Sequence, residues 1–206
     1  MKRYTIGLIT GALLAVSAMM FMGSQNKNLG DITVNSIRIL DDGNGGFIET
    51  YNTDGKLTVF LGTGGDGGGI LSTYNDDGKE TVFLGTGEGG LGFLSTYNAD
   101  GKQTVYLGTG ETGSGFLQTY KADGKLTAFL GTGGTGGDGG GVLSTYNADG
   151  KQTVFLGTGE TGIGLLSTYN KHEVMTGYFG TNTDNDGIAV LSDRYGDVGW
   201  SASGKQ

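Results

Sequence analysis

The sequence predicts an all-β protein: an elongated β-stack built from repeats of about 23 residues, each holding two short strands. Gly supplies 45 of the 206 residues, and the chain has no Pro and no Cys. Runs rich in Thr, Val, Leu and aromatic residues alternate with Gly-rich turns, which is typical of strands joined by tight links. Nothing from Ser24 onward has helical periodicity. The period itself comes from tyrosines spaced 23, 23, 23, 26 and 23 residues apart, at Tyr51, Tyr74, Tyr97, Tyr120, Tyr146 and Tyr169.

The first 23 residues have the layout of an export signal. Lys2 and Arg3 precede an uncharged apolar segment from Tyr4 to Met22. We interpret residues 1–23 as a signal peptide cleaved after Ala18, or as an uncleaved N-terminal anchor, because 19 helical residues reach about 28 Å. Either way the rest of the chain is expected to be exported, to the extracellular space, the cell surface or the periplasm. Membrane contact is expected only through an uncleaved N-terminal segment.

Residues 24–46 are expected to form a linker and the strand that starts the stack. The interval Asp31 to Leu40 has apolar residues in two alternating phases, Ile32 with Val34 and then Ile37 with Ile39. A change of phase by one residue predicts a bend or bulge at Asn35-Ser36.

One repeat shows how the strands are placed. Phe93 to Tyr97 and Thr104 to Leu107 are the two extended runs, and Asn98 to Lys102 lies between them. Asn, Asp and Gly favour tight reversals, so this link is either a hairpin loop or a solenoid corner. The second link, Gly108 to Gly113, is looser in sequence and again depends on Gly.

Both faces of these strands are apolar. Alternation puts Leu94 and Thr96 on one face and Phe93 and Tyr97 on the other. A repeat of this length cannot bury enough apolar surface to fold alone, and a thin single-chain coil would leave one set in water. We therefore expect self-association, most simply as a homotrimer in which each chain supplies one side of a narrow shared core.

The repeat resembles the Gly-rich repeats of triple-stranded β-helices in trimeric phage tail-fibre shafts and related bacterial surface proteins. The resemblance covers about Gly45 to Gly180 and lies in the pattern Gly-x-aliphatic-x-x-Tyr-Asn-x-Asp-Gly-Lys-x-x-Val-x-Leu-Gly. It implies a triple-stranded β-helix, with a single-chain β-solenoid as the other reading. Some phage shafts of this kind cleave glycans, but no position here matches a catalytic motif.

Residues 47–180 are interpreted as six repeats and 181–206 as a C-terminal cap. The repeat decays where His172-Glu173-Val174 replaces the expected Asp-Gly-Lys. Terminal units of a stack need to protect unpaired edges, so a cap is expected there. A binding tip is the alternative.

The residues that suggest chemistry are few. Asn182, Asp184, Asp186 and Asp193 follow the spacing of a calcium loop, although turn-forming Asx residues explain the same pattern. His172 is the single imidazole and is expected to be a solvated turn residue. Asp76-Asp77 resembles a glycosidase carboxylate pair but recurs in a turn. No catalytic or cofactor site is expected, with calcium as the one ligand considered.

The sequence thus predicts an exported, non-enzymatic structural protein that forms a fibrous β-rod as a stalk, filament or adhesin shaft. The alternative is a module that binds glycan or ice through its tyrosines, through the C-terminal segment, or through a file of threonines. A glycan-degrading fibre is a third reading. The net charge of −8 argues against a nucleic-acid partner. The file of threonines consists of Thr50, Thr73, Thr96, Thr119, Thr145 and Thr168.

Overall fold

The computed structural model describes residues 17, 34–40, 43, 45–132, 140–159 and 162–204. The chain divides into two units, 1–38 and 39–206. Apart from Ser17, the predicted signal segment lies outside the described residues, as do residues 31–33 of the expected entry strand. Residues 34–40 bend at Asn35, as predicted, but form no strand. No helix within the described residues has the length and apolar character needed to cross a bilayer.

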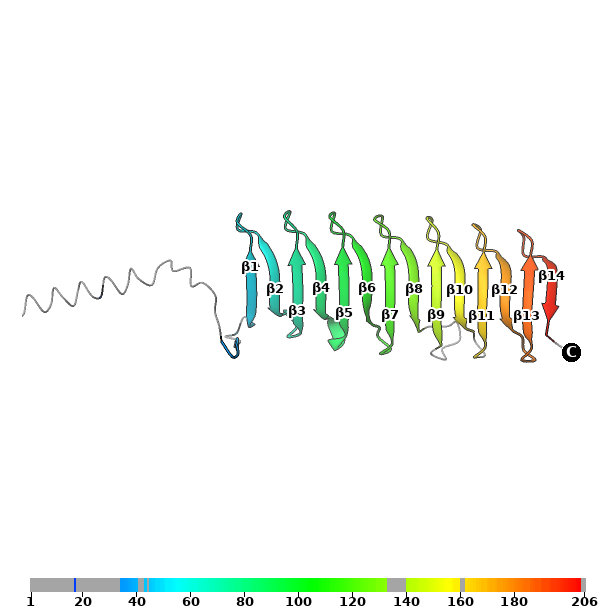
Figure 1. Cartoon of the computed structure of the whole chain (residues 1–206), viewed down its shortest axis with the longest axis horizontal. Helices are drawn as coiled ribbons and strands as arrows, with labels where there is room; N and C mark the ends of the chain where they lie inside the picture. Colours follow the sequence, from blue (N-terminus) through cyan, green and yellow to red (C-terminus); the bar gives the residue numbers. More distant parts are fainter. Residues whose placement is uncertain are drawn as a thin grey trace, which may run out of the picture. The chain divides into compact units, whose positions relative to one another are not determined.

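The second unit is one open antiparallel sheet of 14 strands that follow one another in sequence order (Figure 1). The prediction of an all-β repeat protein is confirmed. A short 3-10 turn, η1 (Glu88–Gly90), lies in one Gly-rich link. The strands are β1 (Phe47–Tyr51), β2 (Leu57–Thr63), β3 (Gly69–Tyr74), β4 (Glu80–Thr86), β5 (Gly92–Tyr97), β6 (Gln103–Thr109), β7 (Gly115–Tyr120), β8 (Leu126–Thr132), β9 (Gly141–Tyr146), β10 (Gln152–Thr158), β11 (Gly164–Tyr169), β12 (Met175–Thr181), β13 (Gly187–Ser192) and β14 (Val198–Ser203).

The register divides the side chains between two faces. Residues paired across antiparallel strands point to the same side of a sheet. Leu94 pairs with Leu107, and Leu107 with Leu117, so the leucines line one side, which we call the leucine face. Ser95 pairs with Tyr106 on the other side, which we call the aromatic face. The central row of the leucine face comprises Ile48, Leu61, Leu71, Leu84, Leu94, Leu107, Leu117, Leu130, Leu143, Leu156, Leu166 and Phe179.

Each odd strand turns into the next even strand through a hairpin. In the turn after β5, Asn98 N–H donates to the Lys102 carbonyl at 2.9 Å and Gly101 N–H donates to the Asn98 carbonyl at 2.9 Å. Gly101 has φ 79°, a conformation that costs other residues energy, which explains the recurring Asp-Gly. The link is therefore a hairpin loop rather than a solenoid corner. The Gly-rich link after β6 has the same bonds, from Gly110 to Ser114 and from Gly113 to Gly110.

A bulge near the hairpin end alters the strand pairing. After Thr96 pairs with Val105, Tyr97 pairs with Gln103, so Thr104 is the extra residue. The shift places the Gln103 side chain on the aromatic face, where its Nε2 donates to Ser95 Oγ at 2.8 Å. Thr104 contacts Thr96 across the other face.

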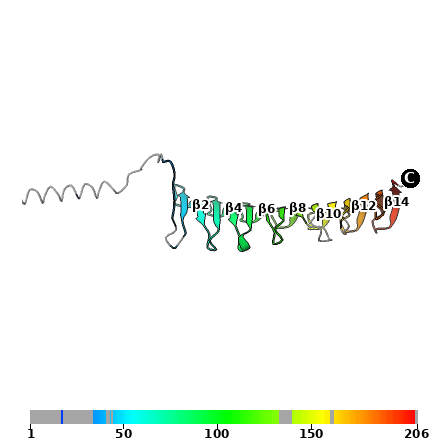
Figure 2. The same cartoon turned by 90° about the horizontal axis from the view of Figure 1, so that it is seen from below.

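The sheet is a single layer, and Figure 2 shows no second layer against either face among the described strands. Val142, at 3 % exposure, is the one buried hydrophobic residue in the described part of the chain. The other buried residues there are serines of the aromatic face: Ser72, Ser95, Ser144 and Ser167. An isolated chain therefore lacks the packed core that normally stabilises a domain.

The region expected to cap the stack contains a further hairpin, formed by β13 and β14. Asp193 takes the turn position that Asn98 occupies after β5, and its Oδ1 accepts N–H bonds from Tyr195 and Asp197. The strand β14 is exposed at all of its residues, including Trp200. The hairpin structure therefore continues to the C-terminus, although the residues there no longer follow the repeat sequence.

Candidate functional site

The six repeat tyrosines occupy equivalent positions, each at the end of an odd strand from β1 to β11. They lie on the aromatic face beside the hairpin turns, and each pairs with the first residue of the next strand, as Tyr97 does with Gln103. Successive tyrosines are two strands apart, or about 9.6 Å. Tyr51 is 57 % exposed and the other five are half-buried. The tyrosines thus form one regularly spaced row, as a binding ladder requires.

Two of these tyrosines have altered acidity. The Tyr51 phenol donates to the Glu49 carboxylate, and this bond raises the pKa of Tyr51 above its ordinary value. At Tyr120, partial burial raises the pKa of the phenol, which donates to Gln118 Oε1. Both groups are therefore neutral hydrogen-bonding phenols at physiological pH.

The file of threonines lies on the leucine face, and the hydroxyls of five of its six members pair with a threonine of the next strand. Thr96 Oγ1 lies 2.8 Å from Thr104 Oγ1, which also donates to the Thr96 carbonyl at 3.1 Å. Equivalent pairs at 2.7–2.8 Å involve Thr50, Thr73, Thr119 and Thr145. These hydroxyl pairs bridge neighbouring strands, which is a structural role.

The aromatic face contains a stack of rings supported by glycines. Ring centroids of Phe83, Phe93 and Tyr106 follow one another at 4.9 and 5.3 Å, and the stack continues to Phe116 and Phe129 at 5.2 and 6.0 Å. A Cβ added at Gly108 would lie 2.8 Å from Tyr106 Cε1 and 2.8 Å from Phe93 Cβ. The glycine therefore leaves the space that the rings occupy.

The structure does not bring the four predicted calcium ligands together. Asn182, Asp184 and Asp186 lie in the turn before β13, whereas Asp193 lies in the turn after it. A strand of this length separates the two turns by about 20 Å. Asn182 Oδ1 accepts N–H bonds from Asp184 at 3.0 Å and Asp186 at 2.9 Å, which is an Asx turn. Within the described ranges, no three His, Asp or Glu side chains form a metal-binding group.

His172 and the Asp76-Asp77 pair occupy hairpin turns. His172 is exposed, and its backbone N–H donates to Asn170 Oδ1 at 2.8 Å in the turn between β11 and β12. Asp77 N–H donates to Asn75 Oδ1 at 3.0 Å in the turn between β3 and β4. Hydrogen bonds within the hairpin turns therefore account for the polar residues at these positions.

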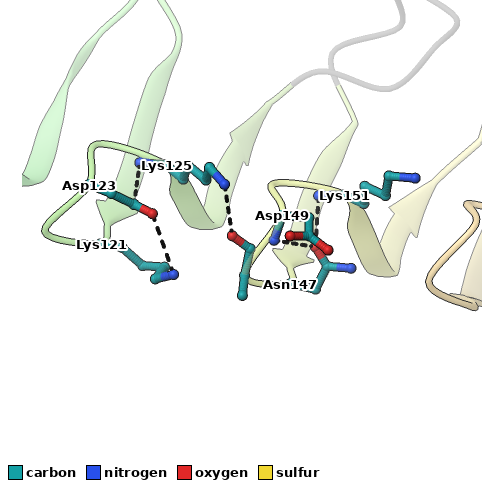
Figure 3. A network of polar contacts seen from close by, with 7 residues as sticks. Lys121, Asp123, Lys125, Asn147, Asp149 and Lys151 are labelled. Atoms are coloured by element: carbon teal, nitrogen blue, oxygen red, sulfur yellow. Dashed lines mark hydrogen bonds and ion pairs between the residues drawn. The ribbon is translucent and has the colours of Figure 1, made fainter.

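Lysines connect neighbouring hairpin turns at the end of the strands where these turns lie (Figure 3). The sequence analysis did not predict these contacts. Lys125 Nζ donates to the carbonyl of Ala148 in the next turn at 3.2 Å, and Lys79 Nζ likewise to Ala99 at 3.0 Å. The recurrence of Asp-Gly-Lys in the hairpin turns after β1, β3, β5, β7 and β9 was the available signal. These contacts are exposed, so each stabilises the sheet only slightly.

One of these turns is built differently. Lys121 replaces the usual Asn after β7, and Asp123 Oδ1 accepts from Lys125 N–H instead, at 3.2 Å (Figure 3). That hydrogen bond is the main reason why the pKa of Asp123 lies below its ordinary value. Lys121 Nζ lies 3.6 Å from Asp123 Oδ2. A carboxylate thus compensates locally for the missing carboxamide.

One hollow combines aromatic and acidic groups beside the Gly-rich links. It has a volume of about 520 Å³ and lies next to Phe93, Tyr106, Glu88 and Glu111. Aromatic rings with nearby carboxylates can contact both the apolar and the hydroxyl parts of a polar ligand.

No protein-family model matches the chain, and the search of curated proteins found no match. The function therefore has to be argued from the geometry of the sheet.

Proposed function

We propose that this chain is an exported, non-enzymatic structural protein that associates with copies of itself into a fibrous β-rod, serving as a stalk, filament or adhesin shaft. The observation that carries the proposal is the lack of a core. Both faces of a 14-stranded sheet are apolar, yet Val142 is the only hydrophobic residue that the described part of the chain buries by itself. Contiguous exposed apolar surface of this extent favours association.

A threefold assembly is consistent with the strand length. Strands of 5–7 residues are about 17–23 Å long. Three such sheets arranged as the sides of a triangular prism have an inscribed radius of about 5–7 Å, and sheets packed face to face each extend about 5 Å toward their partner. Three layers of side chains would therefore fill the prism without a channel. We propose this trimer, the arrangement implied by the resemblance to triple-stranded β-helices.

The experiment is a measurement of molar mass. Sedimentation equilibrium of the exported protein at micromolar concentration is expected to give three times the chain mass, and electron microscopy is expected to show slender rods. A well-ordered monomer would exclude the proposal, and a stable dimer would exclude the threefold form.

Export is tested separately. The predicted signal segment, with cleavage after Ala18, should make mature protein outside the cytoplasm begin at Met19. N-terminal sequencing of the fractionated protein checks this. An intact N-terminus in the membrane fraction supports the anchor, and full-length protein confined to the cytoplasm excludes export.

A second candidate function is the binding of glycan or ice on the aromatic face. The row of six tyrosines and the hollow next to Phe93, Tyr106 and Glu111 favour it. Glycan-array and ice-recrystallisation assays test it, with Tyr97→Ala/Tyr120→Ala as the variant and Thr96→Ala as the control on the other face. Absence of signal from the unmodified protein in both assays excludes this function.

A further inference from the structure

We infer that the leucine face is the contact surface between copies of this chain and that the aromatic face is the outer surface of the assembly. This inference rests on the proposed self-association, but it concerns a different question, namely which side of the sheet is covered. Four independent features of the sheet support it.

The first feature is the difference in how far one chain buries the apolar side chains of each face. On the aromatic face the rings stack on one another and lie over glycines, so they are half-buried without a partner. On the leucine face, the leucines of the odd strands β3, β5 and β7 are half-buried too, but those of the even strands remain about half exposed, with Leu84 at 49 %, Leu107 at 48 % and Leu130 at 52 %. The surface that gains most from being covered is therefore the leucine face.

The second feature is the distribution of polar side chains. The charged and amide side chains of the described strands all lie on the aromatic face: Glu49, Glu80, Gln103, Gln118 and Gln152. The leucine face contains none within β1–β14, and five of its threonines next to the hairpin turns have paired hydroxyls, as at Thr96. Burying that face therefore leaves no charge without water.

The third feature is a row of glycines that the isolated chain does not explain. They begin the odd strands on the leucine face, have no positive φ, and lie beside half-exposed leucines. A Cβ would meet no atom within 4 Å at five of them, and at Gly115 only the Gly108 carbonyl at 3.9 Å. Glycine weakens a strand unless another segment approaches closely. The row is Gly69, Gly92, Gly115, Gly141, Gly164 and Gly187.

The chain itself shows what such a glycine accommodates. Gly46 begins the same row, and a Cβ there would lie 3.1 Å from Ile39 Cγ2 and 3.3 Å from the Ile39 carbonyl. Farther along, the row leaves a hollow of about 530 Å³ beside Gly92, Leu94 and Leu107. A similar hollow of about 410 Å³ lies beside Gly164 and Leu166. Apolar groups from another strand would fit over these glycines in the same way.

The fourth feature is the match between side-chain size and the interior of a triangular prism. Room is greatest at the middle of each side and least at the corners. On the leucine face of β5, Gly92 lies at one end, Leu94 in the middle and Thr96 at the other end. On the aromatic face of the same strand the large residues, Phe93 and Tyr97, lie toward the ends. The leucine face alone has the size profile of an interior.

The occupant that fits this surface is the same face of other copies. Fourteen strands about 4.8 Å apart and about 20 Å long give a face of roughly 1,300 Å², more than the ~800 Å² per partner of a standard interface. The leucine row also keeps a two-strand period of about 9.6 Å. A second copy presents apolar side chains with that same period along the same length.

The test uses two variants of the full exported chain that differ in the face they alter. Leu107→Glu puts a carboxylate on the leucine face of β6, and Gln118→Glu puts one on the aromatic face of the adjacent β7. Leu107→Glu is expected to weaken association at least about tenfold, because its charge would be buried without a partner. Gln118→Glu is expected to change association by less than about twofold, because its charge stays in water. Sedimentation velocity over a concentration series gives both values.

A second measurement keeps the inference testable if Leu107→Glu fails to fold. The chain has no Cys, so Leu107→Cys on the leucine face or Met175→Cys on the aromatic face introduces a single thiol, at positions that are 48 % and 41 % exposed in one chain. In the assembled protein the Leu107→Cys thiol is expected to react with a maleimide at least about tenfold more slowly than the Met175→Cys thiol, since accessibility limits the reaction. Both thiols should react at the same rate in denaturant.

The outcomes separate this inference from the proposed function. A monomeric wild-type protein overturns both. An associated wild type with the Met175→Cys thiol protected and the Leu107→Cys thiol reactive overturns the choice of face alone. Two equally reactive thiols in an associated protein also overturn it, because the contact would then lie at the edge strands β1 and β14. Equal protection of both thiols overturns the assignment of an outer surface.

Discussion

The side chains on the two faces of the sheet are packed to different extents within one chain. The aromatic face is completed within one chain, because the glycine at positions such as Gly108 lets the ring of Tyr106 lie across the backbone and stack on Phe93. On the leucine face the glycines that begin β3 to β13 have open space above them, as at Gly92, and the leucines of the even strands remain about half exposed, as at Leu107. Glycine therefore makes room for an aromatic ring on the aromatic face, whereas on the leucine face it leaves space that one chain does not fill.

This difference indicates how a single-layer sheet divides its functions. A face that satisfies its own side chains can remain in water, whereas a face of unpartnered leucines favours association. Mutations that test the comparison should act on chain stability on the aromatic face and on assembly on the leucine face. All midpoints below should be measured over a range of protein concentration, since association shifts apparent stability.

The largest effect is expected at the glycines. Gly108→Ala should lower the stability by about 2 kcal/mol, because the added Cβ meets Phe93 Cβ and Tyr106 Cε1 at 2.8 Å and the rings must move. Urea unfolding should show a lower midpoint at every concentration. In the matched variant Gly92→Ala the midpoint should fall only at concentrations where the protein associates. Equal behaviour of the two variants would contradict the distinction between the faces.

The next effect is loss of a stacked ring. Phe93 contacts two rings, Phe83 at 4.9 Å and Tyr106 at 5.3 Å. Phe93→Leu should cost about 1–2 kcal/mol, whereas Phe47→Leu should cost about half as much, because among the described aromatic rings Phe47 stacks on Phe60 alone, at 5.7 Å. Thermal unfolding of both variants checks this. Equal losses would mean that the extended stack adds nothing beyond burial.

A substitution in a hairpin turn should alter the stability of the chain without changing the side chains on either face of the sheet. Glu173 has φ 65° at a position where Gly101 stands in the turn after β5. Glu173→Gly should stabilise the chain by about 1 kcal/mol, because a left-handed conformation is unfavourable for Glu. Its ion pair with Lys151, at 3.9 Å, is exposed and contributes little. Glu173→Ala is the control, which should give no such gain in the thermal midpoint.

The smallest effect is expected at the threonine pairs. Thr96→Val removes the hydroxyl that lies 2.8 Å from Thr104 Oγ1, but Thr104 keeps its bond to the Thr96 carbonyl at 3.1 Å. A loss of about 0.5 kcal/mol in unfolding free energy is expected, with no weakening of association, since the leucine face becomes more apolar. Thr96→Ser should retain the pair. Weaker association of Thr96→Val would contradict the placement of this row at the interface.

Local patterns predicted the repeat well. The expected runs Phe93 to Tyr97 and Thr104 to Leu107 fall within β5 and β6, and the alternation of Leu94 with Phe93 separates the faces as expected. These features depend on a two-residue side-chain period and on turn-forming residues, which act over a few positions. Residues 34–40 were expected to belong to an entry strand, but they form no strand despite their apolar alternation.

Contacts between strands were harder to predict from the sequence. Alternation alone would place Thr104 opposite Tyr97, but the bulge pairs Tyr97 with Gln103 and brings Gln103 to Ser95. The twelve-residue segment from Asn182 to Asp193 suggested a common loop, yet an intervening strand holds its two ends apart. Spacing along a chain does not determine distance when the intervening residues are extended.

The sequence by itself determined the period, the turns and the two-sided apolar character of this protein, because strand alternation and the positive φ of turn glycines are properties of short segments. Only the tertiary structure decided the register, the bulges and which glycines lie beneath a ring. Those depend on which strand lies next to which, and they leave the aromatic face filled and the leucine face open.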